Sequence, residues 1–351
     1  MIAKKKKISV IAICMTLIIC LFSGCGSGAD KDKDKKEGEG KKLKVVTTIF
    51  PAYDWSKKML GKNAKNADIT MLLDDGVDLH SYQPSAKDIA KISKCDVFVY
   101  VGGESDEWVK DALKEATNKK MIVINLMSKL GKSVKNEEVK EGMQAEHDHD
   151  HDKDKDHDHD KDKDHDHEHG EEPEKDEHVW LSLKNAKVCC AAISKALQKV
   201  DPENKDLYKQ NLKDYSKELS DLDKEYKKTV DSAKSKTLLF GDRFPFRYLV
   251  NDYGIEYFAA FVGCSAESEA SFKTVKFLAE KVDALGLKHI MTIEKNDHKI
   301  AKTIIKNTKA KNQDILTMDS MQATTGKDVK DGATYLDIMK KNLKVLKKAL
   351  N

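Results

Sequence analysis

The sequence predicts an α/β protein with two lobes, each built on a mainly parallel sheet of four strands flanked by helices, and one long rigid helix that joins them. Short apolar runs rich in β-branched residues alternate with segments that repeat apolar residues at helical spacing, and this alternation indicates parallel sheets. It occurs once in each half of the chain. Between the halves, neither glycine nor proline interrupts residues 203–240, so a single helix can run between the lobes.

Residues 1–24 have the organisation of an export signal. Basic residues at 4–7 precede an apolar run that ends at Phe22 and is too short to span a membrane comfortably. Residues 21–25, with the sequence LFSGC, resemble a bacterial lipobox, whose cysteine is lipid-modified and becomes the mature N-terminus. Residues 25–42 are polar and predict a flexible tether. We therefore expect an exported protein that a lipid on Cys25 anchors to the outer face of the cell membrane. An ordinary signal peptide with an incidental cysteine is the alternative.

The two lobes are expected at residues 43–200 and 236–351. The strands of the first lobe are predicted at residues 43–50, 69–73, 96–101 and 121–126, and those of the second at 237–240, 255–261, 289–294 and 314–318. Segments with helical spacing, such as 52–60 and 85–92, lie between the strands.

The segment 201–235 is predicted to be the long helix between the lobes. Asp201 is a suitable N-cap, and Pro202 follows at the first helical position. An apolar stripe then recurs at steps of three and four residues, formed by Leu207, Leu212, Tyr215, Leu219, Leu222 and Tyr226. A helix from Pro202 to about Ala233 would be about 48 Å long. We favour an intramolecular helix over a coiled coil with another chain because α/β lobes flank it on both sides.

Residues 146–172 form a stretch of histidines, aspartates and lysines inside the first lobe. Eight of the 12 histidines of the chain lie here, namely His147, His149, His151, His157, His159, His165, His167 and His169. Imidazole binds zinc, copper and nickel well. The spacing offers many interchangeable pairs rather than one tetrahedral site, and the lack of apolar residues predicts disorder. We expect an accessory loop that gathers metal; a solvated linker is the alternative.

Charge and cysteine content exclude some classes of function. The formal net charge is only +3, and the lysines are spread evenly along the chain, so nucleic-acid binding is not indicated. Four cysteines remain beyond the signal and the lipobox: Cys95, Cys189, Cys190 and Cys264. The adjacent pair Cys189 and Cys190 lies in an apolar helical run, where buried small side chains are expected rather than a disulfide framework.

Five sequence stretches together resemble the substrate-binding lipoproteins of ABC importers for zinc or manganese. They are TIFPAY at residues 48–53, GVDLHSYQPS at 76–85, DEHVWLS at 176–182, DSMQ at 319–322, and GATYL at 332–336 followed by MKKNL at 339–343. The resemblance implies that His80 and His178 are the first two metal ligands. Local sequence agrees, because His80 follows a predicted strand and a glycine-containing turn, which places it at the carboxyl edge of a parallel sheet.

The second lobe departs from the family pattern. Where relatives carry a third histidine, or a glutamate in manganese-type members, this chain has Arg243, which has no acceptor atom for a metal. In one interpretation Arg243 pairs with Glu267 or Glu269 and Asp242 turns inward as a ligand. In another, Cys264 supplies a thiolate. In a third interpretation, Arg243 and Arg247 each form ion pairs with acidic residues on the surface.

The fourth ligand position has candidates after the third strand of the second lobe. Glu294, Asp297 and His298 follow that strand. We favour His298 as the direct ligand, because a histidine-rich set selects zinc, with Glu294 as a hydrogen-bond acceptor behind it. His289 precedes the strand and is expected to be structural.

These features predict a monomeric protein that binds one Zn²⁺ between its lobes and delivers it to an ABC permease that works with an ATPase subunit. We expect no catalysis and only a modest tilt between the lobes. Mn²⁺ is the alternative cargo, since an oxygen-rich set of Asp242, Glu294 and Asp297 would favour it. Two further alternatives are a surface metal buffer or cell-adhesion protein, and a metallohydrolase, although no HExxH helix is present.

Overall fold

A computed structural model describes residues 42–144, 174–265 and 269–351. The predicted signal peptide, residues 25–41 of the predicted tether, the eight histidines of the stretch at 146–172 and Glu267 lie outside these residues. Within the described part of the chain, no helix is long and apolar enough to cross a membrane.

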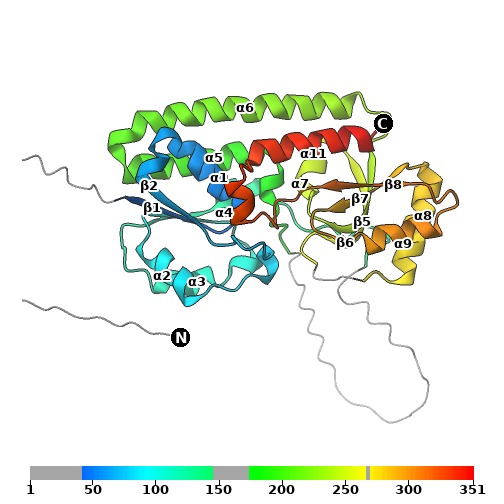
Figure 1. The fold of residues 1–351 in the computed structure, drawn as a ribbon, viewed down its shortest axis with the longest axis horizontal. Helices are drawn as coiled ribbons and strands as arrows, with labels where there is room; N and C mark the ends of the chain where they lie inside the picture. The colour runs from blue at the N-terminus through cyan, green and yellow to red at the C-terminus, as the bar shows by residue number, and fades with distance from the viewer. Residues whose placement is uncertain (1–41, 145–173, 266–268) are drawn as a thin grey trace, which may run out of the picture. The chain divides into compact units, whose positions relative to one another are not determined.

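The first sheet has four parallel strands in the order β2-β1-β3-β4. The strands are β1 (Leu43–Thr47), β2 (Ala67–Met71), β3 (Val97–Tyr100) and β4 (Ile122–Asn125), and the helices among them are α1 (Phe50–Leu60), α2 (Ala86–Lys94), α3 (Val109–Lys114) and α4 (Leu126–Leu130). Helices α2 and α3 lie on one side of this sheet and α1 on the other (Figure 1). Because helices cover both faces, the interior strand β3 (VFVY) has no charged residue, whereas the edge strand β2 includes the exposed Asp68.

The second sheet repeats this design, with parallel strands in the order β6-β5-β7-β8. The strands are β5 (Thr237–Phe244), β6 (Glu256–Val262), β7 (His289–Ile293) and β8 (Asp314–Met318), and the helices are α7 (Arg247–Tyr253), α8 (Phe272–Leu285), α9 (Lys299–Asn307), α10 (Gly326–Lys330) and α11 (Tyr335–Ala349). The predicted fold class is therefore confirmed. Strand β5 is four residues longer than predicted, and its register is irregular between Phe240 and Arg243.

A long helix joins the two lobes, as predicted. Helix α5 (Leu183–Val200) is followed by a 3₁₀ turn, Pro202–Asn204, and then by α6 (Lys205–Asp231). The buried face of α6 consists of Tyr208, Tyr215, Leu219, Leu222, Tyr226 and Val230. Helix α6 packs against α1 and α5 of the first lobe and against α11 of the second. Because one rigid element supports both lobes, a wide hinge motion between them is not expected.

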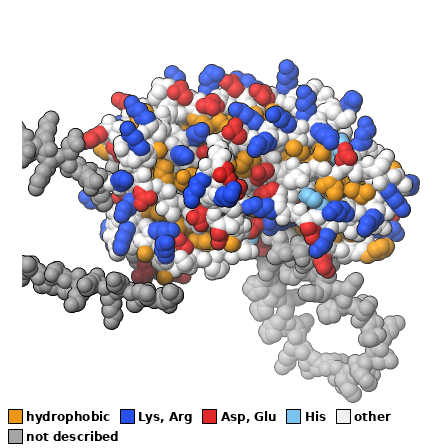
Figure 2. All heavy atoms as spheres, in the orientation of Figure 1, with side chains coloured by type: hydrophobic (Ala, Val, Ile, Leu, Met, Phe, Trp, Pro, Cys, Tyr) orange, Lys and Arg blue, Asp and Glu red, His pale blue; other side chains and the backbone are white. Residues whose placement is uncertain are grey.

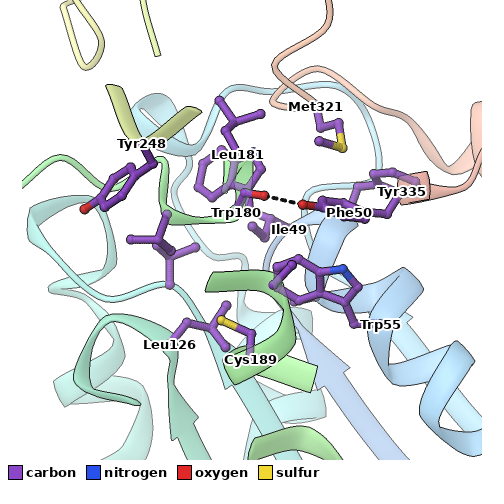
Figure 3. Packing of buried hydrophobic residues seen from close by; sticks show 14 of the residues in the cluster. Ile49, Phe50, Trp55, Leu126, Trp180, Leu181, Cys189, Tyr248, Met321 and Tyr335 are labelled. Carbon is purple, nitrogen blue, oxygen red and sulfur yellow. Dashed lines mark hydrogen bonds between the residues drawn. The ribbon is translucent and has the colours of Figure 1, made fainter. Parts of the chain in front are cut away.

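A cluster of aromatic residues connects the lobes close to the 3₁₀ turn Val179–Leu181. The indole nitrogen Nε1 of Trp180 donates to the Ser320 carbonyl over 2.8 Å, and the Tyr335 hydroxyl donates to the Trp180 carbonyl over 2.6 Å. Trp55 packs edge-on against Tyr335, with ring centroids 5.1 Å apart (Figure 3). Trp180 and Tyr335 are fully buried. This packing fixes the chain immediately after His178.

Charged side chains of both signs are mixed on the face of the molecule shown in Figure 2. Lysine and arginine side chains alternate there with aspartate and glutamate rather than forming one basic patch. This distribution agrees with the even spread of lysines in the sequence and gives no indication of a nucleic-acid surface on that face.

Candidate metal site

His178 is fully buried and is held by the carboxylate two residues before it. The backbone nitrogen of His178 donates to Asp176 Oδ1 over 2.8 Å, and the ring nitrogen Nδ1 lies 3.1 Å from the same oxygen. Gly263 packs against this ring, because a Cβ atom at Gly263 would lie only 3.0 Å from Cε1 of His178. A carboxylate at Nδ1 favours a proton on that nitrogen, which leaves Nε2 free as a ligand atom.

His80 lies in the 3₁₀ turn Leu79–Ser81, just after Asp78, whose side chain caps the turn by accepting from the His80 backbone nitrogen. Its Nδ1 lies 2.8 Å from Ser105 Oγ and 3.5 Å from Glu177 Oε2. Gly103 makes room for the Glu177 carboxylate, since a Cβ atom there would come within 2.2 Å of Oε1. The oxygens around Nδ1 again leave Nε2 of His80 as the free ligand atom.

The two free ring nitrogens face each other. Nε2 of His80 lies 3.3 Å from Nε2 of His178. Two imidazoles bound to one tetrahedral zinc at about 2.0–2.1 Å place their nitrogens about 3.3–3.4 Å apart. The pair therefore already has the spacing of two zinc ligands.

The protonation of the pair also suits a cation. Burial, the neighbouring His178 and Arg243 lower the pKa of His80 to about 3, although Asp78 acts in the opposite direction. Burial lowers the pKa of His178 as well, but the charge and hydrogen bond of Asp176 outweigh it, so this pKa is raised. At neutral pH, at most one of the two rings therefore carries the extra proton of an imidazolium ion. A metal that displaces this proton meets little further competition from protons.

Cys264 is the second-lobe residue that joins this pair. Among the described residues, His80, His178 and Cys264 form the one group of three ligand-type side chains whose ligand atoms all lie within 4.8 Å of one another. Cys264 follows β6 in a turn, and its backbone nitrogen donates to Glu137 Oε1 over 3.0 Å. The three residues come from segments far apart in the sequence, which meet where the strands of both sheets end.

A cavity of about 300 Å³ lies beside the cluster. Its lining includes His80, Cys264 and Ser105, together with Lys175 and four glutamates, Glu104, Glu137, Glu174 and Glu177. Carboxylates outnumber the single lysine, so the cavity attracts cations toward the two imidazoles.

The structure places three other predicted ligands elsewhere in the second lobe. Asp242 is buried, and its Oδ2 accepts from the Ile293 backbone nitrogen over 3.1 Å and from Asn296 Nδ2 over 2.7 Å. Glu294 accepts from the backbone nitrogen and the hydroxyl of Ser320. Both carboxylates link loops of the second lobe through these hydrogen bonds, and neither belongs to the group formed by His80, His178 and Cys264.

His298 is also outside the cluster. It adopts a left-handed conformation, with φ 61°, and it precedes helix α9 as its N-cap. Its backbone nitrogen donates to Asn296 Oδ1 over 2.7 Å. The loop between β7 and α9 is therefore linked to Asp242 through Asn296, and His298 is not part of the described group of ligand-type side chains.

Arg243 contacts the first lobe through Asp78. Its guanidinium forms an ion pair with Asp78, and its Nη1 lies 3.5 Å from the Ser265 carbonyl. Of the predicted partners, Glu269 is not among these contacts, and Glu267 lies outside the described residues. Arg247 pairs with Glu138 Oε2 at 3.3 Å. Arg243 thus connects the second lobe to Asp78, next to His80 in the first lobe.

The residues that orient the imidazoles were only partly foreseeable. Asp176 and Glu177 lie inside the DEH motif that identified His178, so their proximity was visible in the sequence. Ser105 and Glu137 gave no such signal, because separate loops bring them to the site.

The fold and the site define a class: a two-lobed α/β protein that holds a metal-binding imidazole pair where its lobes meet. The chain belongs to the family described as zinc-uptake complex component A, periplasmic (ZnuA), whose model matches residues 45–349.

Individual relatives support this membership. The zinc-binding protein AdcA of Streptococcus pyogenes is 33% identical over 312 residues, which cover 87% of this chain but 56% of AdcA, so the chain spans about half the length of that relative. The high-affinity zinc uptake system protein ZnuA of Bacillus subtilis is 32% identical over 310 residues and 88% of each chain. The Zn(II)-bound ZnuA-like domain of Streptococcus pneumoniae AdcA superposes with a TM-score of 0.63 at 27% identity, over 88% of this chain and 99% of that domain.

Proposed function

We propose that this protein is the extracytoplasmic receptor of an ABC importer, which captures one Zn²⁺ between its lobes and delivers it to a membrane permease. The observation that carries the proposal is the 3.3 Å spacing of the Nε2 atoms of His80 and His178, each with its Nδ1 held by oxygen partners. Such a preorganised imidazole pair binds a transition metal without rearrangement of its rings. Capture and release require no reaction, so no catalysis is proposed.

Zinc is preferred to manganese on the chemistry of the donors. Mn²⁺ favours carboxylates, carbonyls and water, whereas imidazole suits zinc. Two imidazoles form the centre of the cluster, and the carboxylates of Asp242 and Glu294 are engaged in hydrogen bonds within the second lobe. The names of the relatives, which are zinc-binding and zinc-uptake proteins, support the same cargo.

The N-terminal sequence supports the proposed membrane anchor, and the family supports the proposed partner proteins. A lipid on Cys25 would hold the receptor at the outer face of the membrane, beside the permease and its ATPase subunit. The histidine-rich stretch, which lies outside the described residues, would gather zinc weakly near the cluster. Its neighbours Glu174 and Lys175 line the cavity, which supports this accessory role.

The test is a zinc titration against a competing chelator, on the mature protein and on a variant that lacks residues 146–170. The deletion should lower the total zinc bound but retain one tight site. On the deletion background, His80→Ala and His178→Ala should each weaken that site at least 100-fold, since a metal–imidazole bond is lost and the remaining ring is left without its partner.

His289→Ala is the matched control, because His289 lies at the start of β7 near Asp314 and should leave the zinc affinity unchanged. Retention of the tight site in both His80→Ala and His178→Ala would refute the proposal. Loss of the tight site on deletion of residues 146–170 alone would move the principal site to the histidine-rich stretch.

A further inference from the structure

We infer that Cys264 is the ligand through which the second lobe binds the metal, so that the cargo is held by two imidazoles and one thiolate. This inference rests on the proposed function and deepens it, because it names the donor from the second lobe. It also narrows the cargo to thiophilic divalent cations such as zinc and cadmium.

The position of the sulfur is compatible with direct ligation. Zinc bonds of about 2.3 Å to sulfur and about 2.0–2.1 Å to nitrogen place a thiolate about 3.5 Å from each imidazole nitrogen in a tetrahedral site. The Sγ atom of Cys264 already lies within 4.8 Å of the ligand nitrogens of His80 and His178. Cys264 is in the turn that follows β6, outside any helix or strand.

Other second-lobe side chains near the site already form ion pairs or hydrogen bonds with protein groups. Arg243 has no acceptor atom and pairs with Asp78. Asp242 and Glu294 each accept two or more hydrogen bonds from their own lobe. Cys264 is therefore the second-lobe residue of ligand type that the described structure brings to the imidazole pair.

The surroundings of Cys264 differ from those of the other described cysteines. Cys95, Cys189 and Cys190 are fully buried in the core of the first lobe, and the thiol of Cys95 contacts the sulfur of Met121. Cys264 is partly exposed and lines the cavity beside His80. A structural role in the apolar core accounts for the first three but not for a thiol that lies in a polar cavity next to two imidazoles.

Direct ligation of the metal requires Cys264 in its thiolate form. Two imidazoles bring no charge to a divalent cation, and the ion pair of Arg243 with Asp78 is internally neutral. A thiolate adds one negative charge directly on the metal. As the sulfur–metal bond forms, the thiol proton passes to a solvent base, so one proton is released for each cation bound through Cys264.

Co²⁺ is a suitable probe, because a Co²⁺–thiolate bond gives a charge-transfer absorption band that imidazole and carboxylate ligands do not. We expect the band when one equivalent of Co²⁺ is added to the reduced mature protein that lacks residues 146–170. Cys264→Ser and Cys264→Ala should abolish it and weaken zinc binding at least 10-fold, while Mn²⁺ binding changes less.

Cys95→Ser is the control for loss of a thiol away from the site, and it should keep the band. His80→Ala should diminish the band, because the same metal ion touches both residues. Persistence of the band in both Cys264 variants, each shown by circular dichroism to be folded, would overturn the inference. Tight zinc binding by the unmutated protein without a thiolate band would also overturn it while leaving the proposed function intact. Absence of any tight site would refute both.

Discussion

At the scale of single residues, the site is organised by hydrogen bonds to the ring nitrogens that do not face the metal. Asp176 holds Nδ1 of His178, and Ser105 with Glu177 holds Nδ1 of His80. These partners decide which nitrogen of each ring faces the other. Sequence motifs pointed to both histidines, but the orientation of the rings depends on contacts between residues as far apart as positions 80 and 177, which no local pattern encodes.

A buried carboxyl group near the site predicts a pH effect on stability. Burial, together with the nearby Glu177, raises the pKa of Asp106 to about 7, although backbone donors at Val101 and Gly102 oppose the shift. A carboxyl group whose pKa is raised in the folded state stabilises the fold below its unfolded pKa of about 3.9, and that contribution is lost as the pH rises to about 7.

Asp106→Asn removes this titration and keeps an oxygen that accepts from Val101 and Gly102. Relative to the variant, the original protein should therefore lose about 2–4 kcal/mol of unfolding free energy between pH 4 and pH 8. Urea unfolding at several pH values measures the difference. A difference that stays constant across this range would contradict the raised pKa.

At the scale of secondary-structure elements, the sequence was most informative where local pattern and tertiary environment agree. Strand β8 has the predicted limits, Asp314–Met318. Strand β5 continues past Gly241 to Phe244, and Gly241 lets α9 pack closely on it, since a Cβ atom there would lie 2.7 Å from Cα of Ala301. The extension carries Asp242 and Arg243 into the strand, which explains why their side-chain directions were not predicted.

The long helix α6 offers a matched pair of tyrosines for a stability test. The Tyr226 hydroxyl donates to the Met339 carbonyl over 2.6 Å and so links α6 to α11. The Tyr215 hydroxyl is also buried on α6, but it has no hydrogen-bond partner among the described residues. Tyr226→Phe should therefore cost about 1–2 kcal/mol of unfolding free energy, whereas Tyr215→Phe should cost less or stabilise slightly.

Thermal or urea unfolding of the two variants would provide the comparison. Equal losses would show that the Tyr226 hydroxyl does not contribute to the attachment of α11. In that case the joint between the long helix and the second lobe would depend on apolar packing alone.

At the scale of the whole molecule, several contacts hold the lobes together, and two of them lie close to the metal cluster. Trp180 and Tyr335 form a buried joint, and Asp78 with Arg243 forms an ion pair beside the imidazoles. The second connection places Arg243 at the contact between the lobes, where its guanidinium pairs with Asp78. Cys264 is the second-lobe residue of ligand type beside the imidazole pair in the described structure.

The most direct test of the central claim is X-ray absorption at the zinc edge of the protein loaded with one equivalent of zinc, measured on the variant that lacks residues 146–170. We predict scattering from two imidazoles at about 2.0–2.1 Å and from one sulfur at about 2.3 Å. The imidazole signal should fall by half in His178→Ala. A zinc ion surrounded only by oxygen, with no imidazole scattering, would contradict the account.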